Sequence, residues 1–153
     1  MFFLIIRRHT ENISTQVSDW AFAVFGTFAV LLVRPGGDAI APVLSVFLML
    51  VGTFTHITAK LTLRRSFGLV AANRGVRATG LYAFVRHPMY AGYLLTHIGF
   101  FLLAPTAHNA IVYAAAWTAM VGRIIAEEKI LSNDEKFRIL IEKTRWRLVP
   151  GVY

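Results

Sequence analysis

Two short stretches of the chain hold the residue types that bind charged ligands. The first runs from Gly80 to Gly92 and reads Gly-Leu-Tyr-Ala-Phe-Val-Arg-His-Pro-Met-Tyr-Ala-Gly. It places Arg86, His87 and Tyr90 where a basic loop becomes an apolar helix, and an ordinary helix entry needs none of these groups. The second stretch is Glu127-Glu128, a carboxylate pair that closes the next apolar segment. Together the two stretches offer the cations and carboxylates that hold a small polar molecule through charge-assisted hydrogen bonds.

The apolar segments of the chain must bring these two stretches together. Four runs are candidates for helices that span a membrane: Trp20–Val33, Ile40–Ala59, Met89–Ala104 and His108–Ala126. The last two are joined by only two or three residues, which predicts an antiparallel hairpin. The arms of this hairpin have similar lengths, so we expect His87 and Glu127-Glu128 at a similar depth on one membrane face.

The composition supports a membrane protein. The chain has 153 residues, of which 56% are hydrophobic and 16% charged, and its mean hydropathy is +0.57. Soluble domains contain about 25% charged residues. We therefore predict a single domain over residues 1–153, an all-α integral membrane helical bundle with about four transmembrane helices. The chain lacks cysteine, which excludes a disulfide, a thiolate metal site and a cysteine nucleophile.

The segments around these runs carry further signals. Asp19 is a possible helix cap for the first run, which is short for a hydrocarbon core of about 30 Å. Lys60–Arg86 is basic and reads as an interfacial connector on the membrane surface. The tail Lys129–Tyr153 is helical in pattern, with Trp146 suited to the interface. One apolar face is expected on it, made of Ile130, Leu131, Phe137, Leu140 and Ile141.

Lysine and arginine residues are unevenly distributed along the chain. The N-terminal tail has two, the first connection one, Lys60–Arg86 six, Pro105–Asn109 none, and the part from Arg123 onward seven. By the positive-inside rule, both termini and the connector face the cytoplasm. We accordingly attribute the net charge of +8 to topology and anionic lipid headgroups, and not to nucleic acid.

The same residues have plainer interpretations. Arg123 lies one helical turn before Glu127, so a salt-bridged helix end with Arg86 and Arg123 reaching the interface would account for the charges. His56, His97 and His108 lie on different runs without metal-ligand spacing, and we predict no metal site. His97 is expected to pack against a neighbouring helix, whereas His56 is either a packing residue or part of the pocket lining.

The motif Arg86-His87-Pro88-Met89-Tyr90-Ala91-Gly92, followed by Glu127-Glu128, resembles the signature of the isoprenylcysteine carboxyl methyltransferase (ICMT) family. Membrane phospholipid methyltransferases share this pattern of Arg-His-Pro-x-Tyr-x-Gly and a later Glu-Glu. Gly80-Leu81-Tyr82 and Arg147-Leu148-Val149-Pro150-Gly151 also look like flanks of the family. The resemblance covers roughly residues 64–153, the expected cofactor core.

The resemblance implies that S-adenosylmethionine binds at the cytoplasmic membrane face. Glu127 and Glu128 are then candidates for its ammonium or ribose hydroxyls, and Arg86 and His87 for a carboxylate. Tyr82 and Tyr90 offer aromatic faces and hydroxyls. The remaining expected cofactor-site residues are Pro88, which starts the helix, and Gly92, which permits close approach of a helix or the cofactor.

The expected activity is methyl transfer to a lipophilic acceptor, a small molecule or a lipid, that enters from the bilayer. Arg86 and Arg123 are the candidates for orienting an anionic acceptor, and are therefore the predicted catalytic residues. Three alternatives stay open: a phospholipid amine N-methyltransferase, a membrane reductase that uses a nicotinamide cofactor, and a membrane protein that is not an enzyme.

Overall fold

The computed structural model describes residues 14–63, 66, 76 and 78–153, and all regular elements in this part of the chain are helical. They are α2 (Val17–Phe28), the 3₁₀ turn η1 (Ala29–Leu32), α3 (Pro42–Leu63), the 3₁₀ turn η3 (Gly80–Ala83), α4 (Pro88–Leu103), α5 (Ala107–Leu131) and α6 (Glu135–Lys143). The predicted all-α bundle is confirmed. The middle of the predicted connector Lys60–Arg86, residues 64–65, 67–75 and 77, lies outside the described residues.

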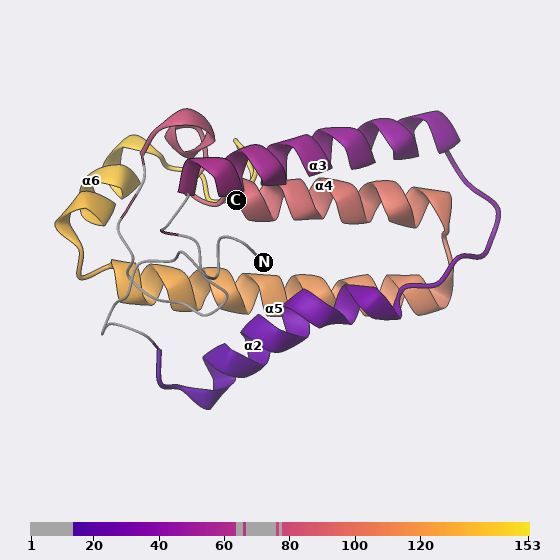
Figure 1. Cartoon of the computed structure of the whole chain (residues 1–153), viewed down its shortest axis with the longest axis horizontal. Coiled ribbons are helices and arrows are strands. Elements are labelled where there is room, and N and C mark those ends of the chain that lie inside the picture. Colours follow the sequence, from indigo (N-terminus) through magenta and orange to yellow (C-terminus); the bar gives the residue numbers. More distant parts are fainter. Residues whose placement is uncertain (1–13, 64–65, 67–75, 77) are drawn as a thin grey trace.

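Four apolar helices lie roughly along one direction, with α3 beside α4 and α2 across α5 (Figure 1). By length and composition, α3 and α5 are each able to cross a membrane, whereas α4 and the Val17–Leu32 segment are shorter apolar helices. The count of four spans therefore stays a prediction. The hairpin between α4 and α5 turns over Ala104–Thr106, and the side chain of Thr106 caps α5 by accepting a hydrogen bond of 3.2 Å from the amide of Asn109.

Close contact between α3 and α4 depends on glycines. A Cβ atom at Gly92 would lie 2.6 Å from the backbone nitrogen of His56 and 2.7 Å from the carbonyl oxygen of Gly52. A Cβ atom at Gly99 would lie 2.7 Å from the carbonyl oxygen of Ser45. These separations are too short for any side chain, so small residues let the two backbones meet, as in other membrane helix pairs.

Several predicted boundaries were wrong by a few residues. Helix α2 begins one turn earlier than expected, with Gln16 as its N-cap, so Asp19 is not a cap and lies in the first turn. A carboxylate there still interacts favourably with the positive end of the helix dipole. Helix α3 continues to Leu63, past the predicted Ala59, because no glycine or proline interrupts it and Lys60 suits a last turn.

The largest difference concerns the tail. Helix α5 runs through Glu127-Glu128 to Leu131, because glutamate and lysine are good helix formers, and a new helix begins after Asp134. The side chain of Asp134 caps α6 by accepting a hydrogen bond of 2.9 Å from the amide of Lys136. Only Phe137 and Leu140 of the predicted apolar face are buried, and Ile141 is exposed. The predicted face of five residues was wrong because Ile130 and Leu131 belong to α5.

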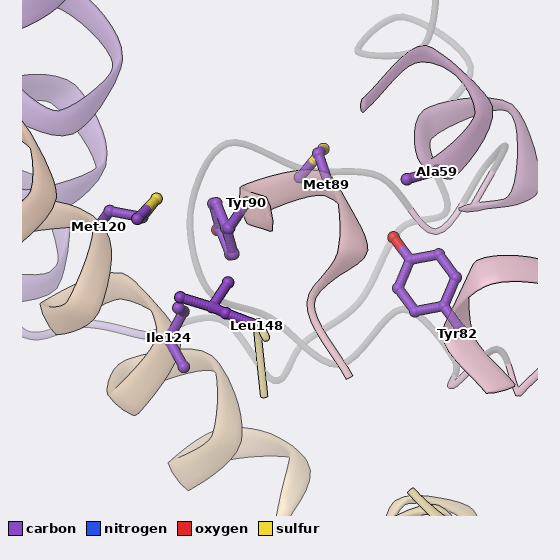
Figure 2. Packing of buried hydrophobic residues seen from close by; sticks show 7 residues of the cluster. All are labelled: Ala59, Tyr82, Met89, Tyr90, Met120, Ile124 and Leu148. Atoms are coloured by element: carbon purple, nitrogen blue, oxygen red, sulfur yellow. The ribbon is translucent and has the colours of Figure 1, made fainter. Parts of the chain in front are cut away.

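At one end of the bundle, a buried cluster joins α3, α4, α5 and the tail. Its members are Ala59, Tyr82, Met89, Tyr90, Met120, Ile124 and Leu148 (Figure 2). Ile124 is completely buried, and Tyr90 is 2% exposed. The cluster forms the apolar base on which the polar residues of the candidate site rest.

Candidate functional site

The entry of α4 is fixed by its neighbours in space. Pro88 is the first residue of α4, as predicted. An amide at this position would have no partner within the helix, so the lack of an amide hydrogen in proline costs no hydrogen bond. The residues before it pair with the tail, because the amide of Arg86 donates to the carbonyl of Trp146 at 2.9 Å and the amide of His87 to that of Arg147 at 2.8 Å. The tail therefore holds Arg86 and His87 at a defined position beside α5.

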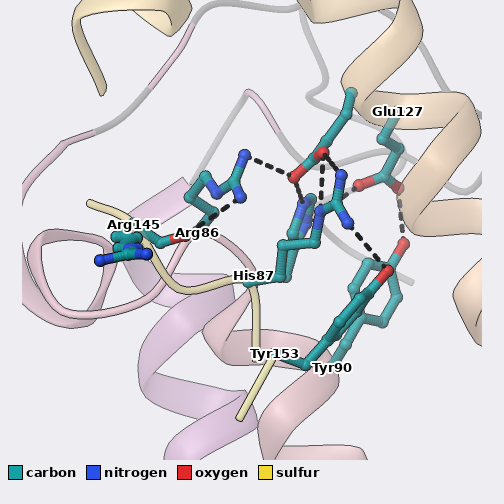
Figure 3. Close-up of polar contacts among 8 residues, drawn as sticks. Arg86, His87, Tyr90, Glu127, Arg145 and Tyr153 are labelled. Carbon is teal, nitrogen blue, oxygen red and sulfur yellow. Dashed lines mark hydrogen bonds and ion pairs between the residues drawn. The ribbon is translucent and has the colours of Figure 1, made fainter. Parts of the chain in front are cut away.

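The structure brings five ionisable side chains together at this end of the helices, and we call them the charged cluster: Arg86, His87, Glu127, Glu128 and Arg147. Figure 3 shows how Arg86, His87 and Glu127 of this cluster face one another beside Tyr90. The predicted proximity of the α4 entry to the Glu127-Glu128 pair is confirmed.

Glu128 is the centre of the charged cluster. Its Oε1 lies 3.0 Å from Nη1 of Arg86 and 3.2 Å from Nε2 of His87. Its Oε2 accepts from Nε and Nη2 of Arg147 at 2.9 and 2.8 Å. Both oxygens are thus fully engaged by two guanidinium groups and an imidazole. An ionised carboxylate only accepts, so Nε2 of His87 carries a proton.

Glu127 is more open than its neighbour. Its Oε1 accepts a hydrogen bond of 2.5 Å from the hydroxyl of Tyr90, and its Oε2 lies 3.8 Å from Nδ1 of His87. Its side chain is 23% exposed, compared with 11% for Glu128. Since each carboxylate oxygen accepts two hydrogen bonds, Glu127 keeps capacity for a ligand.

Tyr82 and Arg123 are two further predicted site residues, and both are buried. Tyr82 is buried beside Ala59 (Figure 2), and its burial, followed by the negative charge of Glu127, raises the pKa of its phenol well above the usual value. Arg123 is buried against α2, where Nη1 donates to the hydroxyl of Thr27 at 3.3 Å. Its guanidinium carbon lies 5.3 Å from the ring centre of Tyr90, a cation–π distance.

Gly92 occupies a different position from the other predicted site residues. It faces α3, where its missing side chain lets His56 and Gly52 approach, so the helix-packing interpretation holds for it. His97 is also a packing residue, as predicted, because Nε1 of Trp117 donates to its Nδ1 at 3.2 Å.

Two residues at this site, Arg147 of the charged cluster and the neighbouring Tyr153, were not predicted as site residues from the sequence. Arg147 binds Glu128, and this hydrogen bond raises the pKa of Arg147 above that of a free guanidinium. Tyr153 accepts from Nη1 of Arg147 at 3.2 Å, and its ring lies 5.1 Å from the guanidinium carbon. Both belong to the tail, and no spacing within the motif indicates that the tail folds back onto it. Among the described residues, no group of three or more His, Asp or Glu side chains is placed to hold a metal ion.

Apolar helices with a network of ion pairs at one end define an integral membrane protein of the helical-bundle class. The model of the isoprenylcysteine carboxyl methyltransferase (ICMT) family matches residues 43–133, which is more than half of the chain, and the chain belongs to this family. It is thus a membrane methyltransferase. The match includes α3, α4 and α5, and hence both parts of the motif. No curated protein matches the chain.

Proposed function

We propose that the protein transfers a methyl group from S-adenosylmethionine to a lipophilic acceptor at the cytoplasmic membrane face. The observation that carries this proposal is the contact between the Arg86–Tyr90 segment of α4 and Glu127-Glu128 of α5 at one end of apolar helices. We further propose that residues 1–153 act as one domain with a cofactor core at about 64–153.

The polar groups of the site suit the cofactor. S-adenosylmethionine carries an ammonium, a carboxylate and ribose hydroxyls. Glu127 is partly exposed and retains accepting capacity for the ammonium or the hydroxyls. The Nε atom of Arg86 is buried and has no hydrogen-bond partner among the described residues, although Nη1 of the same side chain binds Glu128. A carboxylate of the cofactor or of the acceptor would satisfy it.

The two glutamates differ in their proposed tasks. Glu128 is saturated by Arg86, His87 and Arg147, so it acts as a positioning residue that holds these groups in place. Glu127 acts as the cofactor ligand and also orients the hydroxyl of Tyr90. This division follows from the number of bonds each carboxylate already makes.

When bound, the cofactor supplies an activated methyl group on its sulfonium for in-line displacement. The residues of the chain align the acceptor with it and exclude water. Arg86 and Arg123 orient an anionic acceptor, with Arg123 acting from the far side of the Tyr90 ring. A carboxylate acceptor needs no general base, whereas an amine must first lose a proton. Tyr82, with its raised pKa, stays neutral and contributes a hydroxyl and an aromatic face.

Calorimetry in detergent tests the cofactor assignment. S-adenosylmethionine should give a saturable heat of binding, and a nicotinamide dinucleotide should give none. Heat with the dinucleotide alone would point to a reductase, and heat with neither would point to a protein without this cofactor chemistry.

The acceptor and the orientation of the protein need separate tests. Transfer rates should rise with the alkyl chain length of the acceptor, because each buried methylene contributes about 0.8 kcal/mol. A rate independent of chain length would indicate a soluble substrate. For orientation, Ala107→Cys and Glu135→Cys proteins should differ in labelling from outside the cell, with the cysteine at 107 accessible and that at 135 protected.

A further inference from the structure

Helix α2 lies outside residues 43–133, which the family model matches, yet it contacts a residue of the candidate site. It packs across α5 (Figure 1), and the two helices meet closely beside Arg123. A Cβ atom at Gly122 would lie 2.9 Å from the ring of Phe22, and Ala23 of α2 is 1% exposed. Close packing of small residues therefore fixes the position of α2 next to Arg123.

The hydroxyl of Thr27 on α2 makes two hydrogen bonds of opposite sense. It donates to the carbonyl of Ala23 at 2.7 Å, and it accepts from Nη1 of Arg123 at 3.3 Å. A hydroxyl has one hydrogen and two lone pairs, so the bond to Ala23 leaves only accepting capacity toward Arg123. A guanidinium group only donates. The bond between α2 and α5 is therefore complementary in its donor and acceptor.

Arg123 connects this hydroxyl to the candidate site. The residue is 8% exposed, so its guanidinium is enclosed by protein and does not extend to the aqueous interface. Besides its bond to Thr27, the guanidinium faces the ring of Tyr90, whose centre lies 5.3 Å from the guanidinium carbon. Attraction between a cation and an aromatic face is stronger where water is excluded. The position of the guanidinium thus influences the position of the ring.

Tyr90 extends the chain of contacts to the proposed cofactor ligand. Its side chain is buried, and its hydroxyl donates to Oε1 of Glu127 at 2.5 Å (Figure 3). A ring held on one face by a cation has a defined plane, and the hydroxyl at its end then has a defined position. Contacts therefore run without a break from Thr27 through Arg123 and Tyr90 to Glu127.

We infer that Thr27 is a positioning residue of the site: its hydroxyl holds the guanidinium of Arg123 against the ring of Tyr90 and so keeps the Tyr90 hydroxyl on Glu127. Without this hydroxyl, the buried guanidinium loses an acceptor and shifts toward other oxygen atoms, because an unsatisfied buried donor is costly. The consequence for S-adenosylmethionine rests on the proposed function, whereas the placement of Tyr90 does not.

Fluorine NMR tests the placement of Tyr90 without a cofactor. The full chain is labelled with 3-fluorotyrosine and studied in detergent, and the resonance of residue 90, one of five, is assigned by its loss in Tyr90→Phe. Thr27→Val keeps the shape of the side chain but removes the hydroxyl, and should shift this resonance. Thr27→Ser keeps the hydroxyl and should restore it. Thr118→Val is the matched control, because Thr118 makes the same bond, at 2.9 Å, to the carbonyl of Ala114 on the exposed side of α5.

Binding of S-adenosylmethionine gives the functional readout. Thr27→Val should weaken binding about 3- to 10-fold, the net effect of one hydrogen bond, and Thr27→Ser should bind as the parent protein does. A double variant tests the route. When Arg123→Met is already present, adding Thr27→Val should change neither the resonance nor the affinity further, because the hydroxyl acts through the guanidinium.

An unchanged resonance in Thr27→Val, or no recovery in Thr27→Ser, would overturn the inference, and so would an equal shift in Thr118→Val. A further change on adding Thr27→Val to Arg123→Met would overturn it as well, because Thr27 would then act by another route. If the double variant fails to fold, the single variants decide.

The two proposals fail in distinguishable ways. If the parent protein does not bind S-adenosylmethionine, the proposed function falls, and the fluorine resonances alone decide the role of Thr27. If the parent binds the cofactor and Thr27→Val shifts the resonance without weakening binding, only the inference about Thr27 falls.

Discussion

The two ends of the helical bundle satisfy their polar groups in opposite ways. At the far end, completely buried Asn109 makes three hydrogen bonds to backbone groups: its Nδ2 donates to the carbonyls of Arg34 and Ala104, and its Oδ1 accepts from the amide of Arg34. At the other end lies the charged cluster, where Glu128 is saturated with hydrogen bonds, but Glu127 is partly exposed and Nε of Arg86 is unsatisfied within the described part of the chain.

The difference distinguishes a residue with a structural role from a ligand-binding site. Asn109 has a neutral side chain and completed bonds, so its presence is explained by the turn that it holds together. The charged cluster holds more hydrogen-bonding capacity than its own pairs use, and charges at a membrane face are costly unless they are paired or used. Excess capacity of this kind indicates a ligand.

The largest effect is expected from breaking the centre of the charged cluster. Glu128→Ala leaves two guanidinium groups and an imidazole without their common partner and should lower the free energy of unfolding by about 3–5 kcal/mol, as for a broken buried ion pair. Thermal unfolding in detergent measures it. A loss below about 1 kcal/mol would mean that these ion pairs behave as exposed ones.

A smaller effect is expected at the neutral end. Asn109→Ala leaves two carbonyls and one amide without their partner and should lower the stability by about 2–3 kcal/mol, the cost of unsatisfied buried groups. Because this end lies far from the charged cluster, binding of S-adenosylmethionine by the folded variant should be unchanged. Weakened binding with an intact fold would show that the two ends are coupled.

The α3–α4 contact should respond to one added methyl group. Gly92→Ala places a Cβ atom 2.6 Å from the backbone nitrogen of His56, so the helices must separate and the stability should fall by roughly 1–3 kcal/mol. Gly26→Ala is the matched control, because its Cβ atom would lie 3.3 Å from the methyl group of Ala119 and 3.7 Å from Cδ of Arg123, with no backbone atom closer than 3.8 Å. Equal stability of the two variants would contradict the helix-packing role of Gly92 and favour the alternative role, contact with the cofactor.

The smallest effect on stability is expected at Glu127, where the effect on binding should be large. Glu127→Gln keeps an acceptor for the hydroxyl of Tyr90 but removes the charge, and should weaken binding of S-adenosylmethionine by about 1–3 kcal/mol, as for a charge-assisted contact. Isothermal titration of the Glu127→Gln and Glu128→Gln proteins with S-adenosylmethionine distinguishes the roles of the two glutamates. If Glu128→Gln alone weakens binding, the proposed division between them is reversed.

Local signals in the sequence predicted the helices and the meeting of the two motifs. Proline positions, apolar runs and a short link were enough to predict that His87 would reach Glu128, because a hairpin with arms of equal length has few geometries. The tail was less predictable. Its pairing with residues 86 and 87 is made by backbone groups, which every residue carries, so no residue type indicates it.

The sequence also could not assign different roles to Glu127 and Glu128. The two are adjacent and chemically identical, and their environments differ because Arg86 and Arg147 bind Glu128, whereas the hydroxyl of Tyr90 binds Glu127. Likewise, Gly92 is the last residue of the motif, but only the packed structure identifies α3 as the helix that approaches it.

The pairing of the tail with the α4 entry also has a consequence for biosynthesis. Thr144 donates to the carbonyl of Ala83 at 3.3 Å, and Trp146 and Arg147 accept from residues synthesised some sixty positions earlier. The apolar helices are able to enter the bilayer as they emerge from the translocation machinery, but Glu128 forms its ion pair with Arg147 only after Arg147 has been synthesised. Each newly made molecule therefore passes through an interval in which it is inserted and still incomplete, and completion occurs only after the last helix has been translated.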